Sequence, residues 1–292
     1  MRSGFCAIVG RPNVGKSTLL NALVGQKVAI TTPVPQTTRN AIRGIRHRDD
    51  VQVVFTDTPG LHKPKTLLGS RLNQVARDSL SSVDCIVFLV DGSVPIGRGD
   101  HFLARLLVDV RPPVLATLNK VDAFSRARQL PQLSRLAGLG DWAEVVPISA
   151  ETGDNVEVLA ALIAARMPEG PAYFPAEQVT DQSVEQRAAE IIREKAITIM
   201  REEVPHSVAV VVDELAPGRT EGVTAIAARL YVERDSQKGI VIGHGGTVLR
   251  DIGTRARPEL EALLGGPVYL DLRVKLLKEW QRDARKLARL GY

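Results

Sequence analysis

The chain has 292 residues, which suggests two domains, and its 44% hydrophobic and 24% charged residues are typical of a globular protein rather than a disordered one. The net charge of +5 lies in residues 1–170, whereas residues 171–292 carry equal numbers of basic and acidic residues. Within the second part, basic residues are concentrated in 229–289. This distribution permits a polyanionic partner but does not require one. No apolar stretch approaches the roughly 18 residues that span a bilayer, and both cysteines, Cys6 and Cys85, lie in apolar runs, so we expect a soluble cytoplasmic protein without disulfides or a zinc site.

Residues 1–167 alternate between strand-like and helical patterns. Apolar runs occupy 5–9, 51–56, 85–90, 114–118 and 145–148, and helical patterns lie near 16–24, 70–81, 99–109, 125–137 and 155–166. This alternation predicts an α/β fold with a mostly parallel sheet flanked by helices. Residues 41–48, followed by Asp49-Asp50 and Val51, predict one antiparallel hairpin.

A boundary follows Met167, because residues 168–175 contain three prolines and a glycine. We place the first domain at 1–170, a linker at 171–182 and a smaller α+β domain at 183–292. Ser183 and Gln186 form a capping-box pattern that begins a helix. Strand-like runs follow at 207–215 and 223–232, then a short helix, a glycine cluster at 243–246, a helix at 247–264, a strand at 267–274 and a basic helix at 275–289.

The sequence GRPNVGKS at 10–17 fits the pattern GxxxxGK[ST], directly after a strand-like run and before a helix. Its glycines let backbone N–H groups turn toward phosphate, Lys16 adds a positive charge, and the Ser17 hydroxyl can bind Mg²⁺. The pattern predicts a nucleoside-triphosphate site at the start of the helix. Its residues are Gly10, Arg11, Pro12, Asn13, Val14, Gly15, Lys16, Ser17 and Thr18.

Two further patterns supply metal and γ-phosphate contacts. DTPG at 57–60 offers the Asp57 carboxylate to Mg²⁺ and the Gly60 N–H to the γ-phosphate. In the loop 31–40, a threonine can reach the same metal when the γ-phosphate is present, so that phosphate loss releases the loop. We assign this role to Thr38, with Thr37 as the alternative. The predicted metal ligands are Ser17, Thr38 and Asp57.

NKVD at 119–122 selects the base. Guanine presents N1–H and N2–H₂ side by side, and the Asp122 carboxylate can accept both, whereas adenine offers no such pair. The pattern therefore favours GTP over ATP, and a backbone N–H of Ser149 or Ala150 is expected to meet guanine O6. The remaining predicted nucleotide contacts are Thr58, Pro59, Gly60, Leu61, Asn119, Lys120, Ser149 and Ala150.

A GHGG loop at 243–246 separates two predicted helices in the second domain. A GxxG loop lets a nucleic-acid backbone approach closely, and the order α-β-β-α-α-β matches a type II KH domain, which binds single-stranded RNA. A plain helix–helix turn is the alternative for the loop alone. The predicted RNA contacts are Arg234, Lys238, Gly243, His244, Gly245, Gly246 and Arg250.

The predicted terminal helix at 275–289 is basic and amphipathic. Such a helix can bind RNA phosphates, pack as an ordinary helix or lie on a membrane surface, and we rank RNA contact first. Its basic residues are Lys278, Arg282, Arg285, Lys286 and Arg289.

These motifs resemble those of the translation-factor-related GTPases. Across essentially the whole chain, GRPNVGKS, QTTR, DTPGLH, NKVD, ISA and the closing LGY resemble the Era-like family of bacterial ribosome-assembly GTPases. The resemblance implies that GTP or GDP with Mg²⁺ is the cofactor. It also implies that the partners are the 3′ region of 16S rRNA and the 30S subunit, whose maturation the protein assists.

The catalytic set is incomplete in the sequence. Leu61 occupies the position where many GTPases carry a water-orienting glutamine, and the side chain of leucine cannot orient water. His62 is either a base or, more in keeping with its loop, a solvent-facing residue. The resemblance places Asn13 where some relatives hold K⁺, and we hypothesise that this cation neutralises developing charge. The catalytic candidates are Lys16, Thr38, Asn13 and Gly60.

We therefore expect a slow, monomeric GTPase switch without a DNA partner. In this scheme GTP orders the 31–40 loop, the linker relays that state, and the KH groove opens to RNA. One alternative is a GTPase whose main partner is a protein or the inner face of the cell membrane, with the KH-like domain as a docking module. A metabolic P-loop enzyme is a second alternative, and NKVD argues against it.

Overall fold

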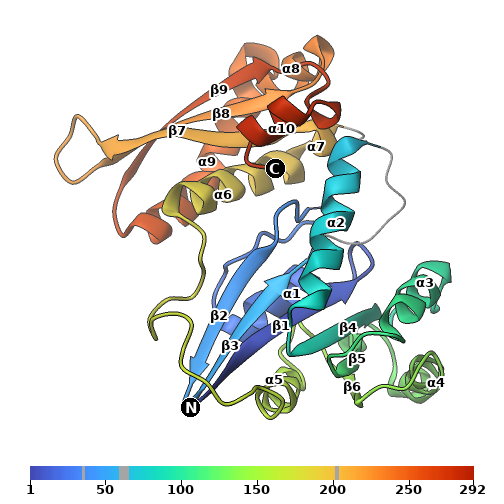
Figure 1. Cartoon of the computed structure of the whole chain (residues 1–292). Helices are drawn as coiled ribbons and strands as arrows, with labels where there is room; N and C mark the ends of the chain where they lie inside the picture. Colours follow the sequence, from blue (N-terminus) through green and yellow to red (C-terminus); the bar gives the residue numbers. More distant parts are fainter. Residues whose placement is uncertain (35–36, 59–65, 201–203) are drawn as a thin grey trace. The chain divides into compact units, whose positions relative to one another are not determined.

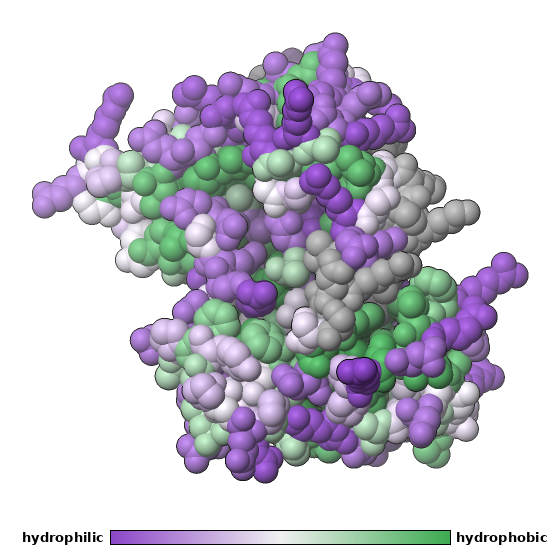
Figure 2. All heavy atoms as spheres, in the orientation of Figure 1, coloured by the Kyte–Doolittle hydropathy of each residue, from purple (hydrophilic) through white to green (hydrophobic). Residues whose placement is uncertain are grey.

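The structure is a computed structural model that describes residues 1–34, 37–58, 66–200 and 204–292, without the side chains of 75–79 and 81. The chain forms two compact units (Figure 1). One comprises most of residues 1–181, and the other comprises residues 182–292 with two short earlier segments. Hydrophilic and hydrophobic side chains are interspersed on the visible face of each unit (Figure 2), as on ordinary protein surfaces.

The first unit is built on a six-stranded sheet with the order β2-β3-β1-β4-β5-β6. Only β2 is antiparallel to its neighbour, so the predicted hairpin and the mostly parallel sheet are both confirmed. The strands are β1 (Arg2–Gly10), β2 (Ile42–Arg48), β3 (Val51–Asp57), β4 (Cys85–Asp91), β5 (Val114–Asn119) and β6 (Glu144–Pro147).

Helices cover both faces of this sheet (Figure 1). Ile8 packs in the cluster that contains α1 and α5, whereas its neighbours Ala7 and Val9 pack in the cluster that contains α2, α3 and α4. This alternation is the period-2 pattern of a strand, and it explains why the run at 5–9 is apolar throughout. The helices are α1 (Lys16–Val24), α2 (Leu67–Ser81), α3 (Arg98–Leu107), α4 (Arg126–Ala137) and α5 (Val156–Ala164).

The segment after α5 is hydrogen-bonded to the sheet of the first unit. The fully buried side chain of Gln52 in β3 donates to Phe174 O at 2.7 Å and accepts the N–H groups of Tyr173 and Phe174 at 2.8 and 3.0 Å. Further along, Ile45 N donates to Val179 O at 2.8 Å, and Thr180 Oγ1 donates to Arg43 O at 2.7 Å. We call residues 168–181 the strap. The predicted domain limits and the linker at 171–182 stay predictions.

The second unit holds a three-stranded sheet with the order β7-β8-β9, in which β7 is antiparallel and β9 parallel to β8. The predicted capping box is present, because Gln186 N donates to Ser183 Oγ at 3.3 Å and Ser183 N donates to Gln186 Oε1 at 3.0 Å. The elements are α6 (Val184–Ile199), α7 (Val204–Ser207), β7 (Ala209–Pro217), β8 (Thr224–Val232), α8 (Asp235–Ile242), η2 (His244–Gly246), α9 (Thr247–Leu264) and β9 (Val268–Leu276).

The prediction of one basic helix over 275–289 is wrong. Strand β9 continues to Leu276, because β8 offers pairing partners as far as Val232, whose carbonyl also accepts Leu277 N at 2.8 Å. The left-handed conformation of Glu279 (φ 49°) then turns the chain. A short η3 (Trp280–Arg282) follows, and α10 (Ala284–Arg289) begins where Asp283 accepts the N–H groups of Arg285 and Lys286.

Residues 207–215 also differ in part from the prediction, because Ser207 ends α7 and the strand begins at Ala209. The buried indole of Trp280 explains why the strand does not include Ser207. Its Nε1 donates to Ser207 O at 3.0 Å and takes the carbonyl away from sheet pairing.

Candidate functional site

The carboxyl ends of β1, β3 and β5 bring the predicted nucleotide residues together. The loop from 10 to 17 joins β1 to α1, and it contains left-handed backbone at Asn13 (φ 63°) and Gly15 (φ 100°). A Cβ on Gly15 would lie 2.4 Å from Asn119 Nδ2, and one on Gly10 would lie 2.5 Å from Leu89 O. Glycine is therefore required at both positions, as expected for a loop that exposes its N–H groups to an anion.

Lys16 lies inside this loop with 7% of its surface exposed. Its Nζ donates to Arg11 O at 2.9 Å and to Gly10 O at 3.3 Å. Burial lowers the pKa of Lys16, and the nearby Asp57 carboxylate opposes that shift. A phosphate group at the loop would add a second anionic partner for this ammonium.

The three predicted metal ligands converge from three separate segments. Ser17 Oγ and Thr38 Oγ1 both donate to Asp57 Oδ2, at 2.6 and 3.0 Å, and the two hydroxyl oxygens lie 3.1 Å apart. Asp57 is fully buried, and among the described residues its Oδ1 has no hydrogen-bond partner. Two hydroxyls and a carboxylate with an unused oxygen form an all-oxygen set, which fits Mg²⁺.

Replacing Asp57 by Asn is expected to stabilise the nucleotide-free protein while removing Mg²⁺-dependent nucleotide binding. Burial raises the pKa of Asp57, although Lys16, Ser17 and Thr38 oppose the shift. A raised folded-state pKa means that the ionised carboxylate costs stability at neutral pH, and that this cost disappears as the pH falls below the raised pKa. In melts with a chelator, Asp57→Asn should raise Tm by roughly 2–4 °C at pH 7 and by less at acidic pH.

The exposed Asp109→Asn variant serves as the control for removal of one charge. An Asp57→Asn variant that melts lower than the wild type at pH 7, or that gains stability equally at all pH values, contradicts this account.

Asn119 joins three loops at the base-recognition end. Its Nδ2 donates to Val14 O at 2.8 Å, and its Oδ1 accepts Ala150 N at 2.9 Å. Lys120, in left-handed conformation (φ 65°), donates from Nζ to Asn13 O at 2.9 Å. Asp122 follows in the short helix Val121–Ala123 with an exposed side chain. The NKVD sequence thus ties the phosphate loop to the segment at 149–150.

The two N–H groups expected to contact guanine O6 already donate hydrogen bonds within the protein. Ser149 N donates to Asp154 O at 3.0 Å, and Ala150 N donates to Asn119 Oδ1 at 2.9 Å. A base oxygen would have to share one of these N–H groups or replace its present acceptor. The O6 contact stays a prediction.

Two carboxylates that sequence reasoning missed hold the loop in place. Asp91 Oδ2 accepts Lys120 Nζ at 2.6 Å, and Asp100, which is fully buried, accepts Arg11 Nε at 2.7 Å. Burial works to raise the pKa of Asp91, but hydrogen bonds from Lys120 and Ser93 lower it overall. Asp91 was recognisable, since it directly follows the predicted strand at 85–90 and so lies at the same sheet edge. Asp100 carries no comparable signal.

Three of the predicted nucleotide contacts, Pro59, Gly60 and Leu61, lie outside the described residues, as does His62. Pro12 and Thr18 lie half-buried in the phosphate-loop segment, and Thr58, which is buried, donates from Oγ1 to Ile8 O at 2.9 Å. The hydroxyl of Thr58 therefore fixes the end of β3 to β1.

The GHGG loop joins α8 to α9, and its glycines at 243, 245 and 246 all have positive φ. A Cβ on Gly243 would lie 2.5 Å from Val248 Cγ2, whereas one on Gly245 or Gly246 would meet no described atom within 4 Å. The loop thus packs at its start and is open at its tip, as close approach of a nucleic-acid backbone requires. Arg234, His244 and Arg250 are exposed, and Lys238 is half-buried.

The helices of the described residues are all too short or too polar to cross a membrane. The same residues contain no group of three or more His, Cys, Asp or Glu side chains placed to hold a metal ion. Cys6 and Cys85 are free and buried, as predicted, on the neighbouring strands β1 and β4.

Comparison with known proteins finds relatives of both units. A family model described as a 50S ribosome-binding GTPase matches residues 5–120, and a KH domain model matches residues 203–281. GTPase Era of Nocardioides sp. is 52% identical over 100% of the chain and 96% of its own length. GTPase Era of Mycobacterium avium is 51% identical over 100% of the chain and 99% of its own length.

Two solved structures are similar over the full length. Era from Aquifex aeolicus bound to GDP and AlF₄⁻ matches with a TM-score of 0.96 and 39% identity, covering 100% of this chain and 99% of that chain. A structure of Era with MgGDPNP and nucleotides 1506–1542 of 16S rRNA matches with the same score, identity and coverage.

Proposed function

The chain belongs to the Era family of GTPases, and from that premise we propose that it binds the 3′ region of 16S rRNA and assists assembly of the 30S subunit under the control of bound GTP. The protein is a GTPase that hydrolyses GTP to GDP and phosphate. The observation that carries the proposal is the presence, in one chain, of the converged Ser17, Thr38 and Asp57 side chains and of an open GHGG loop. A full-length relative has been solved with MgGDPNP and 16S rRNA nucleotides.

The residues of the first unit divide the work of hydrolysis. Lys16 would neutralise the β- and γ-phosphate oxygens, and Asp122 and Asn119 would hold the base side of the site. Ser17, Thr38 and Asp57 would hold Mg²⁺, which supplies charge neutralisation between the phosphates. Leu61 stands at the position of the usual glutamine, and a leucine side chain cannot orient the attacking water, so we expect slow turnover.

Asn13 is proposed to hold a monovalent cation against the phosphates. It is exposed at the tip of the phosphate loop, in left-handed conformation. We expect GTP turnover to be about tenfold faster in K⁺ than in Na⁺, and Asn13→Ala to remove that difference while GTP affinity changes little. Equal turnover of the wild type in the two salts, measured by phosphate release, contradicts this role.

The strap is the physical candidate for the relay from nucleotide to RNA. Strand β2 begins at Ile42, four residues after Thr38, and the strap is bonded to β2 through Arg43 and Ile45. Gln52 fixes a second point of the strap on β3, the strand that ends at Asp57. Movement of Thr38 on phosphate loss would therefore be transmitted to the strap, which leads into the KH-containing unit at Gln182.

Replacing Gln52 by Leu is expected to uncouple RNA binding from the nucleotide. The three hydrogen bonds to Tyr173 and Phe174 are lost, whereas the volume of the side chain is kept. The RNA affinity in the GTP-analogue state divided by that in the GDP state should fall toward one, with GTP affinity unchanged within about twofold. The matched control is Glu177→Ala, an exposed residue of the same strap. A Gln52→Leu variant that keeps the wild-type ratio refutes the relay through the strap.

We propose a cytoplasmic monomer as the setting of this function. The alternative function, docking to a protein partner, predicts that the GHGG loop is dispensable. The variant in which GHGG becomes GDDG tests that difference.

The 30S role is tested in cells depleted of the protein. We expect accumulation of 16S rRNA with an unprocessed 3′ end and a deficit of 30S subunits, restored by the wild-type chain but not by Lys16→Ala. Normal 16S processing and subunit ratios after depletion would remove the proposed role in assembly.

A further inference from the structure

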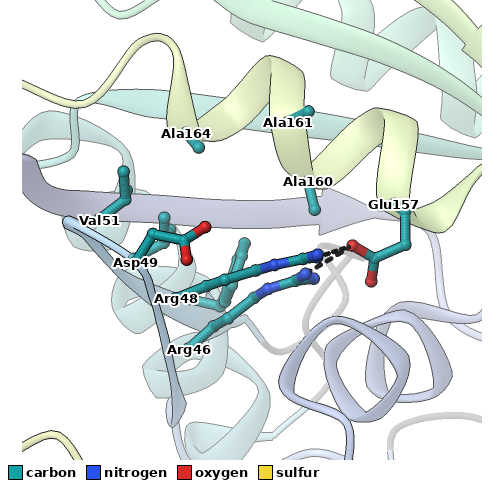
Figure 3. Close-up of a pocket in the computed structure, with 10 residues that line it drawn as sticks. Arg46, Arg48, Asp49, Val51, Glu157, Ala160, Ala161 and Ala164 are labelled. Atoms are coloured by element: carbon teal, nitrogen blue, oxygen red, sulfur yellow. Dashed lines mark hydrogen bonds and ion pairs between the residues drawn. The ribbon is translucent and has the colours of Figure 1, made fainter.

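A pocket of 670 Å³ lies between the β2–β3 hairpin and helix α5, and none of its lining residues belongs to the nucleotide site (Figure 3). Its volume is in the range of small-molecule sites. The apolar lining comes from Val51, Val53 and Phe55 on β3 and from Ala160, Ala161 and Ala164 on α5. Because the three alanines carry only methyl groups, the helix leaves space beside the strand.

One end of the pocket carries two arginines that share a single carboxylate. Arg46 and Arg48 each bind Glu157 Oε2, at 2.6 and 2.7 Å, and both side chains point toward Glu157 (Figure 3). The Arg46 side chain is only 15% exposed and also donates to Leu23 O at 3.2 Å, so its position is fixed. Glu157 is 65% exposed, so its side chain can turn away into solvent.

Exchange of this carboxylate is energetically accessible. The hydrogen bond from Arg46 lowers the pKa of Glu157, so the group is ionised at neutral pH. Arg48 and Glu157 are both largely exposed, so their ion pair contributes little net stability, and an incoming anion would restore the charge-assisted hydrogen bonds of both arginines. Asp49 also lines the pocket and would repel a second negative charge on the occupant.

We propose that this pocket binds a small molecule with one anionic group, a carboxylate or a phosphate monoester, on an apolar body. The anionic group takes the place of Glu157 at Arg46 and Arg48, and the apolar body lies against Val53 and the alanines of α5. None of the residues that line this pocket belongs to the nucleotide or RNA sites.

The test titrates the full-length protein with octanoate and with octyl phosphate while the methyl signals of the alanines are followed by NMR. We expect Kd below about 1 mM for at least one of the two anions, with the shifts confined to Ala160, Ala161 and Ala164. The two arms separate carboxylate from phosphate. 1-Octanol, which has the same body without charge, should bind at least about tenfold more weakly. Equal binding of octanol and both anions, or shifts spread over the protein, overturns the proposal.

Two variants keep the test falsifiable. Ala164→Leu fills the apolar part of the pocket and should weaken anion binding about tenfold, whereas Ala165→Leu, the next residue and outside the lining, should not. Glu157→Gln removes the competing charge and should tighten binding about threefold. Unchanged affinity in Ala164→Leu, with its Tm equal to that of Ala165→Leu, overturns the assignment of the site. Weaker binding in Glu157→Gln overturns the exchange.

Discussion

Replacing Asp122 by Asn is expected to convert a protein that prefers GTP into one that prefers xanthosine triphosphate. We expect the Asp122 carboxylate to accept guanine N1–H and N2–H₂, whereas an asparagine amide would set its own N–H donors against N2–H₂. Xanthine carries an oxygen in place of that amino group, so it accepts the new donor. Loss of one charge-assisted hydrogen bond and creation of a donor–donor contact should cost GTP about 3 kcal/mol, or roughly 100-fold in Kd.

The measurement is competition binding of the two triphosphates to wild type and variant. The exposed Asp141→Asn variant is the control, since it makes the same change away from the site. GTP affinity within about threefold of wild type in Asp122→Asn would show that this residue does not contact the base.

Converting GHGG to GDDG, by His244→Asp and Gly245→Asp, is expected to abolish RNA binding and leave GTP binding intact. Gly245 is exposed at the open tip of the loop, so two carboxylates there would face the RNA backbone. The RNA backbone could no longer approach the loop closely, and the two carboxylates would repel its phosphates. RNA affinity should therefore weaken by at least about 100-fold. Asp at the left-handed Gly245 position (φ 59°) is tolerated, so the fold should persist.

A matched variant makes the same change in net charge elsewhere in this unit. Arg219→Ala with Thr220→Asp lies in the exposed turn between β7 and β8 and should lose little affinity. If the GDDG variant still binds RNA and still supports 30S assembly, the docking alternative gains and the KH groove is not the RNA site.

Continuous sequence patterns were the predictable part of this protein. The five apolar runs of the first unit became β1, β3, β4, β5 and β6, because strands that are buried on both faces leave an unmistakable composition. The helix predicted over 275–289 was wrong, because basic and apolar residues recur there at helical spacing. In the structure, β8 nevertheless pairs with the chain as far as Leu276. Tertiary pairing overrode local pattern there.

In the candidate site too, only the residues that belong to short motifs could be predicted. Ser17, Thr38 and Asp57 were predicted from short motifs whose places in a parallel sheet are known, and the structure brings their side chains together. Gln52 and Asp100 belong to no motif. Gln52 bonds with residues more than 120 positions away, and Asp100 lies 89 positions from Arg11, so only folded geometry identifies them.

If bound GTP controls RNA binding, the nucleotide state changes the Kd of the protein for an oligonucleotide covering the 3′ end of 16S rRNA. This Kd is measured with GDP and with a non-hydrolysable GTP analogue. The titrations include a scrambled oligonucleotide and two salt concentrations. We expect tighter, sequence-dependent binding in the GTP-analogue state that persists at the higher salt. Weak binding that is the same for both sequences and both nucleotides and is lost at the higher salt would show only a basic surface, and GTP would then not control RNA binding.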